Sequence, residues 1–129
     1  MELGIKGLAE TVVVHENTAA AIGSGALEVF ATPSMIALME KASMDSVQPY
    51  LEAGQSTVGT RIETSHIAAS PLGAHIRAES TLVEIDRRML TFEVKAFADG
   101  ELIGEGRHQR FIVSADRFME KTLAKQNKS

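Results

Sequence analysis

The sequence predicts an α+β domain in which an antiparallel β-sheet wraps around one long α-helix. Apolar and polar residues alternate in several segments after residue 56, as they do in strands that bury one face. The links between these segments are short, so consecutive strands are expected to run antiparallel. A single long apolar helix precedes them, and it is the natural cover for the buried face of such a sheet.

The predicted elements follow one another without a long linker, so residues 1–129 are expected to form a single domain. A small, glycine-rich segment over 17–30 is either a loop or a short helix. The long helix follows over 33–48, and a short C-terminal helix begins after Ser114. Strands are predicted at residues 8–16, 57–68, 75–85, 89–98 and 101–113.

The composition is that of an ordinary globular protein, with 44% hydrophobic and 23% charged residues. The N-terminal segment has an acid at Glu2 and no apolar stretch suited to a signal peptide. No window reaches the ~18 apolar residues of a membrane helix. We therefore expect a cytoplasmic protein without a membrane partner. The chain has no cysteine, which excludes disulfides, a thiolate nucleophile and a cysteine-based zinc site.

The charge pattern argues against nucleic-acid binding, because the net charge is −4 and basic residues cluster only in the C-terminal tail. Aromatic residues make up 5% of the chain and tryptophan is absent, so a base-stacking platform is not expected. A few local Arg or Lys residues would still suffice for a small phosphorylated ligand. The four histidines lack metal-ligand spacing, so no metal site is predicted.

Glu40 is the first candidate site residue, because it lies where a carboxylate is costly. On a helical wheel it falls in the middle of an apolar face formed by Ile36, Ala37, Met44 and Val47. A buried carboxylate is strongly unfavourable unless it is paired or neutral, so such positions are usually functional. Glu40 could attack a carbonyl carbon or activate a water molecule. The alternative is a structural acid that reaches the helix edge and bonds a backbone amide.

His66 is the second candidate, because strand alternation places it on the more apolar face of 57–68. That face is expected to hold Val58, Thr60, Ile62 and Thr64 as well. The intrinsic pKa of histidine suits general acid–base catalysis, although a single histidine in a strand is more often structural. Thr32 lies at the start of the long helix, where it can be the N-cap, the third member of a Thr/Glu/His set, or both.

Three motifs extend these observations, because they occur together and in a particular order. They are EVFATPSMIALMEKAS, PYLEAGQSTVGT and TSHIAASPLG. From about residue 8 to residue 120 the sequence resembles the fluoroacetyl-CoA-type thioesterases, a branch of the hot-dog fold superfamily. The resemblance implies that Thr32, Glu40 and His66 form the catalytic set, and that Gly59 and Arg110 belong to the active site.

Gly59 and Arg110 also have interpretations of their own. Gly59 interrupts a strand, which indicates a bulge or a close backbone approach, and its N–H could face a thioester oxygen. Arg110 is predicted on the inward side of the last strand, with His108 and Leu102. It could bind substrate or keep Glu40 charged; the alternative is an exposed arginine that guards the strand.

The resemblance implies an acyl-CoA thioesterase that hydrolyses a short-chain acyl-CoA to the free acid and coenzyme A. It also implies a homodimer with active sites at the subunit interface, which the unprotected edge strands favour independently. No cofactor is expected beyond the coenzyme A of the substrate. A hot-dog acyl-CoA hydratase or dehydratase and a non-catalytic acyl-CoA binding module remain alternatives. The loop 21–28 has no aromatic residue, so nothing in it supports fluoroacetyl recognition.

Overall fold

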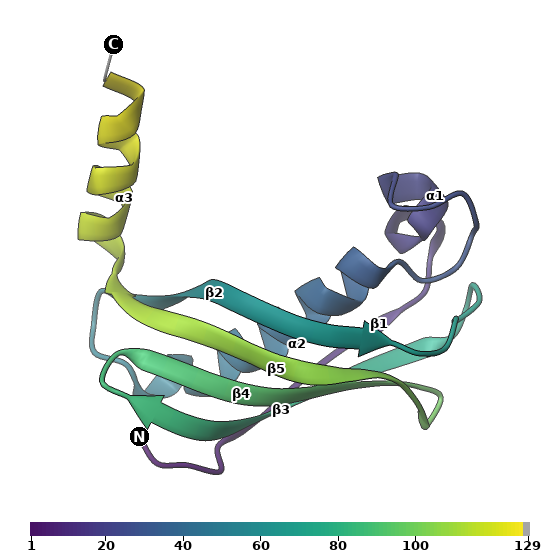
Figure 1. The fold of residues 1–129 in the computed structure, drawn as a ribbon, viewed down its shortest axis with the longest axis horizontal. Coiled ribbons are helices and arrows are strands. Elements are labelled where there is room, and N and C mark those ends of the chain that lie inside the picture. The colour runs from purple at the N-terminus through teal and green to yellow at the C-terminus, as the bar shows by residue number, and fades with distance from the viewer. Residues whose placement is uncertain (128–129) are drawn as a thin grey trace.

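The computed structural model describes residues 1–127 and contains a five-stranded sheet with one long helix packed against it (Figure 1). In chain order the elements are β1 (Lys6–Val12), α1 (Ala19–Ile22), α2 (Thr32–Val47), β2 (Gln55–His66), β3 (His75–Asp86), β4 (Met89–Ala98), β5 (Glu101–Ser114) and α3 (Ala115–Ala124). Within the described residues, no helix combines the length and the hydropathy needed to cross a bilayer. The predicted fold class, an antiparallel sheet around one long helix, is confirmed.

The five strands form one antiparallel sheet in the order β1-β3-β4-β5-β2. Tight turns join β3 to β4 and β4 to β5, as predicted. In the second of these turns Asp99 and Gly100 both have positive φ, as a type I′ hairpin requires. The expectation that a turn pairs β2 with the next strand is wrong, because residues 67–74 cross over instead and β2 pairs with β5. Strands β1 and β2 are therefore the two edges of the sheet.

The first strand ends earlier than the predicted span of 8–16. It covers Lys6–Val12, and a turn of 3₁₀ helix follows at His15–Asn17. There Asn17 accepts a hydrogen bond from the N–H of Val14 at 3.0 Å, so the apolar run continues past the strand into a capped turn.

The core lies between α2 and one face of the sheet. The alternating residues of the predicted third and fourth strands are almost completely inaccessible, as the pattern indicates. They are Ile76, Ala78, Leu82, Leu90, Phe92, Val94 and Ala96. Burial of each large apolar side chain contributes about 1.5–3 kcal/mol to the stability of this layer.

The buried face of α2 differs from the predicted one. It consists of Met35, Leu38, Met39, Ala42, Ser43 and Val47. Glu40 therefore lies beside the buried stripe, with 39% of its side chain exposed, rather than in its middle. Apolar residues surround α2 almost completely, so their pattern does not select one face. Strand β1 approaches this face closely, because a side chain on Gly7 would overlap the carbonyl of Ala42.

Two elements extend from opposite ends of the sheet. Helix α1 and its loop rise at one end, and α3 projects from the other end as the continuation of β5 (Figure 1). The predicted C-terminal helix after Ser114 is confirmed, although the Ser114 side chain makes no capping hydrogen bond. Phe118, Met119 and Leu123 on this helix are 39%, 49% and 59% exposed.

Candidate active site

Thr32 and His66 meet at the start of α2. The Oγ1 atom of Thr32 lies 2.7 Å from Nδ1 of His66, which ends β2. The interpretation of Thr32 as the N-cap is wrong, because the N-cap is Ala31 and Thr32 is the first residue of the helix. Pro33 at the second position suits this start. The Thr32 hydroxyl is therefore available to the imidazole rather than to the helix backbone.

The His66 ring is half-buried, and burial lowers its pKa below the ordinary value of 6.5. The backbone of Ala68 raises this pKa, but by less than burial lowers it. The imidazole is consequently neutral at pH 7. Its other nitrogen, Nε2, is enclosed and makes no hydrogen bond of normal geometry within the described residues. A neutral ring with one nitrogen on Thr32 and the other unengaged is suited to proton transfer.

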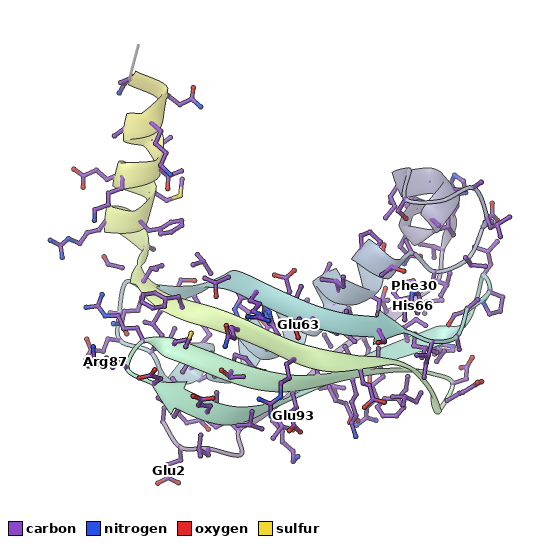
Figure 2. All side chains as sticks on the ribbon, in the orientation of Figure 1. Glu2, Phe30, Glu63, His66, Arg87 and Glu93 are labelled. Carbon is purple, nitrogen blue, oxygen red and sulfur yellow. The ribbon has the colours of Figure 1, made fainter. Side chains whose placement is uncertain are left out.

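A surface hollow of about 570 Å³ opens beside the Thr32–His66 pair. Phe30 and His66 lie close together there, below the α1 segment (Figure 2). The lining consists of small, apolar or uncharged residues apart from the histidine, and it has no lysine or arginine. Its members are Ala19, Ser24, Val29, Phe30, Thr32, Pro33, His66, Ile67, Ala68 and Ala69. This surface suits a small acyl group rather than phosphates.

Glu40 belongs to a second cluster, with Arg110 and Gly59. Its Oε2 atom lies 3.6 Å from Nη1 of Arg110, which is only 5% exposed. A Cβ atom on Gly59 would lie 2.8 Å from the same carboxylate oxygen, so the glycine leaves the space that the carboxylate occupies. The half-exposed Glu40 can therefore contact a ligand while the buried guanidinium balances its charge.

A network of hydrogen bonds fixes the direction of Arg110. Its Nε donates to Oγ1 of Thr57 at 2.7 Å, and its Nη2 donates to the Thr57 carbonyl at 3.0 Å. Its Nη1 lies 3.1 Å from Nε2 of His108, whose Nδ1 lies 2.8 Å from the carbonyl of Arg61. This geometry assigns the His108 proton to Nδ1 and leaves Nε2 to accept from Arg110.

Burial lowers the pKa of His108 and of Arg110, and the charge of Arg110 lowers the pKa of His108 further. His108 is therefore neutral at pH 7, while Arg110 stays charged. The alternative interpretation of Arg110 as an exposed strand residue is wrong. Leu102 is not on the same face as His108 and Arg110, because the register shifts between Ala96 and Phe97 in the partner strand.

A β-bulge in β2 explains why Gly59 faces Glu40. The register with β5 shifts between Gly59 and Arg61, which leaves Thr60 as the extra residue. The predicted bulge is confirmed, but it also reverses the strand alternation. Thr57 and Gly59, rather than Val58 and Thr60, consequently lie on the side of α2.

One chain forms two separate clusters from the five predicted residues. Thr32 contacts His66, and Glu40 contacts Arg110 and faces Gly59. Thr32 and Glu40 are separated by slightly more than two turns of α2, or about 12 Å along the helix axis. In the described part of the chain, no side-chain hydrogen bond or ion pair joins one cluster to the other. Within residues 1–127, no three His, Asp or Glu side chains gather closely enough to hold a metal ion.

Thr57 and His108 are the residues of the candidate site that the sequence did not indicate. Strand alternation predicts His108 on the face of Arg110 but gives it no role, and no pattern in the sequence singles out Thr57. Their contacts depend on the pairing of β2 with β5, two strands that are distant in the sequence. The only local signal is the alternation of His108 with Arg110.

The sequence and the fold both match known thioesterases. The family of fluoroacetyl-CoA-specific thioesterases matches residues 13–116. The fluoroacetyl-CoA thioesterase of Streptantibioticus cattleyicolor is 37% identical over 98 residues, which cover 76% of this chain and 70% of that protein.

Solved structures agree with this assignment. A variant of the fluoroacetyl-CoA-specific thioesterase, in complex with fluoroacetate and CoA, is 32% identical. It superposes with a TM-score of 0.86 over 92% of this chain and 99% of that chain. A thioesterase superfamily member from Thermus thermophilus, 26% identical, superposes with a TM-score of 0.90 over 98% of this chain and 93% of its own. The chain therefore belongs to the fluoroacetyl-CoA-specific thioesterase family and has its hot-dog fold.

Proposed function

We propose that this acyl-CoA thioesterase hydrolyses short-chain acyl-CoA, with Thr32, Glu40 and His66 as its catalytic residues. The observation that carries the proposal is the half-exposed Glu40 carboxylate beside the buried Arg110 guanidinium. The reaction adds water across the C–S bond of the thioester and releases a carboxylic acid and the thiol of coenzyme A. The composition supports a single cytoplasmic domain without a nucleic-acid or membrane partner.

Glu40 can support hydrolysis in two ways. Its carboxylate can attack the thioester carbonyl carbon, break the C–S bond and form an anhydride that water then hydrolyses. It can instead accept a proton from a water molecule that attacks the same carbon. Arg110 balances the carboxylate charge in both cases, and a backbone N–H near Gly59 faces the oxyanion that develops on the carbonyl oxygen.

Thr32 and His66 complete the chemistry at the leaving group. When Glu40 activates the water, the neutral imidazole can pass the proton that the carboxylate has accepted on to the departing thiolate. The Thr32 hydroxyl, at 2.7 Å from Nδ1, holds the ring in one orientation for this transfer. The acyl group then lies in the uncharged hollow next to this pair.

A homodimer accounts for the separation of the two clusters. We propose that the free edges of two β2 strands pair, so that Thr32 and His66 of one subunit approach the second subunit's carboxylate and arginine cluster. A twelve-residue edge strand presents a row of unpaired backbone groups, which favours continuation of the sheet.

The acyl specificity proposed here is the short-chain class rather than fluoroacetyl-CoA. The segment 17–30 has a single aromatic residue, Phe30, which is 2% exposed and forms part of the core. The rest of this segment next to the hollow consists mainly of small residues such as Ala19 and Ser24. Nothing in it provides a specific contact for a fluorine atom.

Thiol release from a panel of acyl-CoA substrates tests the proposal. The panel should include acetyl-, propionyl-, butyryl-, octanoyl- and fluoroacetyl-CoA, with Glu40→Gln as the inactive control. We expect turnover to be fastest with the short unsubstituted chains. Hydration of crotonyl-CoA without thiol release would instead indicate a hydratase, and tight binding without turnover would indicate a binding module.

A further inference from the structure

Helix α3 carries an apolar stripe that residues 1–127 leave uncovered. Its members recur at the spacing of three and four residues that forms one side of a helix: Ala115, Phe118, Met119, Thr122 and Leu123. None of the residues of this helix is buried. An amphipathic helix that exposes its apolar side to water is typical of a segment that packs on a partner.

Two residues of the stripe point away from the rest of the subunit. Arg117, Phe118 and Lys121 line a hollow against the end of β5, so this side of the helix faces its own chain. Met119 and Leu123 lie about 160° round the helix from the mean direction of Arg117 and Lys121. They are 49% and 59% exposed. The uncovered side of α3 therefore faces outwards.

A second exposed apolar surface lies at the opposite end of the sheet. Leu27, in the loop after α1, is 70% exposed, and Ile67, directly after β2, is 60% exposed. Ile67 also lines the hollow beside Thr32 and His66. In Figure 1, α1 and α3 both rise past β2, one at each end of this edge strand. Because β2 has twelve residues, its ends are about 36 Å apart, and the two apolar surfaces of one subunit cannot meet.

Two-fold pairing of the β2 edges brings one surface to the other. Antiparallel pairing over the full strand puts Gln55 of one subunit opposite the partner's His66. Ser114, at which β5 ends, lies beside Gln55. Two strand spacings, or about 10 Å, thus separate the start of α3 from the partner's His66. A helix of ten residues, about 15 Å long, then crosses the edge and reaches the partner's acyl hollow.

The charges near the two surfaces favour this contact over a contact between two α3 helices. Residues 7–40, which include the loop after α1, contain four acids and no lysine or arginine. Residues 115–127 contain three bases and two acids. Contact of α3 with another α3 would bring two net basic segments together, whereas contact with the partner's 7–40 segment brings opposite net charges together.

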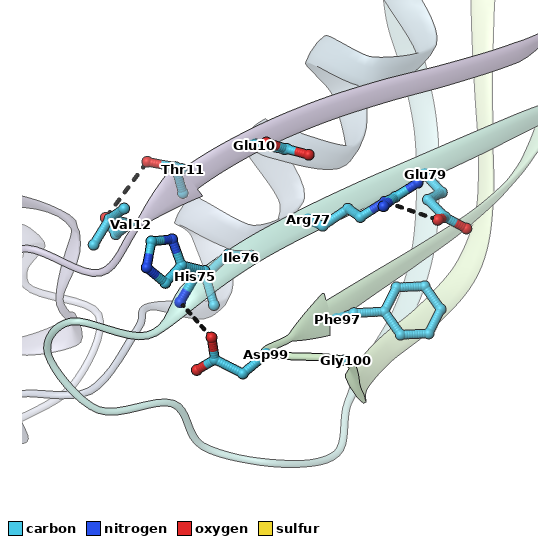
Figure 3. Close-up of a pocket in the computed structure, with 10 residues that line it drawn as sticks. All are labelled: Glu10, Thr11, Val12, His75, Ile76, Arg77, Glu79, Phe97, Asp99 and Gly100. Carbon is cyan, nitrogen blue, oxygen red and sulfur yellow. Dashed lines mark hydrogen bonds and ion pairs between the residues drawn. The ribbon is translucent and has the colours of Figure 1, made fainter.

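A different hollow suits the apolar stripe less well. It measures about 620 Å³ and lies along β1 and the start of β3 (Figure 3). Glu10, Glu79 and Asp99 line it, and Arg77 there is paired with Glu79 at 3.0 Å. Methionine and leucine side chains would take these charges out of water without offering a polar partner. The hollow beside His66 has no lysine, arginine or acid in its lining.

We propose that Met119 and Leu123 of each subunit pack on the partner's apolar surface at Ile67 and close the partner's acyl hollow. The inference rests on the proposed dimeric thioesterase, and it adds a wall from the second subunit to the acyl site. Because this wall consists of apolar side chains, it limits the length of the acyl chain without supplying a charge.

Cross-linking tests the contact without relying on catalysis. The chain has no cysteine, so engineered cysteines are its only thiols. Met119→Cys combined with Ala69→Cys places one thiol on the outer side of α3 and one in the lining of the hollow. Within one chain these positions lie at opposite ends of β2, so a short bismaleimide can join them only between subunits. We expect a covalent dimer on a denaturing gel.

Lys95→Cys combined with Ala69→Cys is the matched control, because Lys95 is exposed on β4 and belongs to neither surface. This pair and each single variant should remain single chains. If the reagent leaves the Met119→Cys and Ala69→Cys protein as single chains, the inference is wrong, whether or not thioesters are hydrolysed. Covalent dimers of Met119→Cys alone would also overturn it, because they would show that α3 meets a second α3.

Substrate preference tests the closure of the hollow. Met119→Ala shortens the proposed wall, so it should raise kcat/KM for octanoyl-CoA relative to acetyl-CoA roughly 10-fold. Glu120→Ala changes the neighbouring residue on the polar side of α3 and should leave this ratio within about twofold. An unchanged ratio in Met119→Ala would refute the wall. Cross-linking in a protein that hydrolyses no thioester would support the contact and refute the proposed function.

Discussion

Gly59→Ala perturbs the position of the Glu40 carboxylate without removing a functional group. The added Cβ would lie 2.8 Å from Oε2 of Glu40, 3.3 Å from Cε1 of His108 and 3.5 Å from Nη1 of Arg110. Ordinary van der Waals contact begins at 3.4 Å, so the carboxylate must move by the difference of 3.4 and 2.8, about 0.6 Å. His108 and Arg110 are buried, so the half-exposed Glu40 is the group that moves.

The expected result is a loss of turnover in a protein that folds normally. Gly59 does not have a positive φ, so alanine can adopt its backbone conformation. We expect the free energy of unfolding to change by less than about 1 kcal/mol. A misplacement of this size should lower kcat roughly 10- to 100-fold, or about 1.4–2.7 kcal/mol of barrier, with KM within a few fold.

Thiol release measures the rate, and urea unfolding measures the stability. Ser65→Ala, an exposed change on the other face of β2, is the control. In the double variant with Glu40→Gln, the alanine should cause no further loss, because the group it displaces is already inactive. A Gly59→Ala enzyme with wild-type kcat and normal stability would show that the position of Glu40 does not limit the reaction.

Five further outcomes are expected. Glu40→Gln should fold normally and lose roughly 10²–10⁴ in kcat; a stable and fully active variant would remove the catalytic assignment. Because the pKa of His66 is lowered, kcat should stay constant from pH 7 to pH 6.5 and decrease only below pH 6.5. His66→Ala should lower kcat roughly 10²-fold and remove this decrease at low pH. His66 and His108 bind protons less tightly in the folded protein than in the unfolded chain. The free energy of unfolding should therefore decrease as the pH falls from 7 through 6.5, and urea unfolding at pH 7 and at pH 5.5 measures the decrease. Arg110→Met should cost about 1–3 kcal/mol of unfolding free energy in urea, because Thr57 and His108 lose their partner, whereas Lys95→Met should have little effect. In solution, light scattering should give twice the chain mass of 13.9 kDa; a stable monomer at micromolar concentration with full activity would contradict the shared site.

The sequence predicted the fold most securely where one face of a strand is buried. Strands β3 and β4 alternate without interruption, and the residues predicted to point inward are inaccessible. The pairing of β2 with β5 was not predictable, because it depends on the crossover at 67–74 rather than on a local turn. The orientation of α2 was not predictable either, because the apolar residues of that helix do not mark a single face.

The candidate site was predictable in its members but not in its arrangement. Glu40 stood out as a carboxylate among apolar residues, and Gly59 as a glycine within a strand. The sequence did not show that the bulge after Gly59 places Thr57 next to Arg110, because that contact requires the register with β5. It also did not show that a single chain keeps Thr32 and Glu40 apart.

Because the two clusters are separate, the acyl-binding surface and the carboxylate site depend on parts of the chain that can mutate independently. The surface around the acyl group comes from the segment before α2 and from the turn after β2, whereas the carboxylate is held by the paired strands β2 and β5. Substitutions at Ala19, Ser24 or Ala69 can therefore reshape the acyl site without altering the bonds that orient Arg110. A family built in this way can acquire new acyl substrates through a few loop mutations while its reaction stays the same.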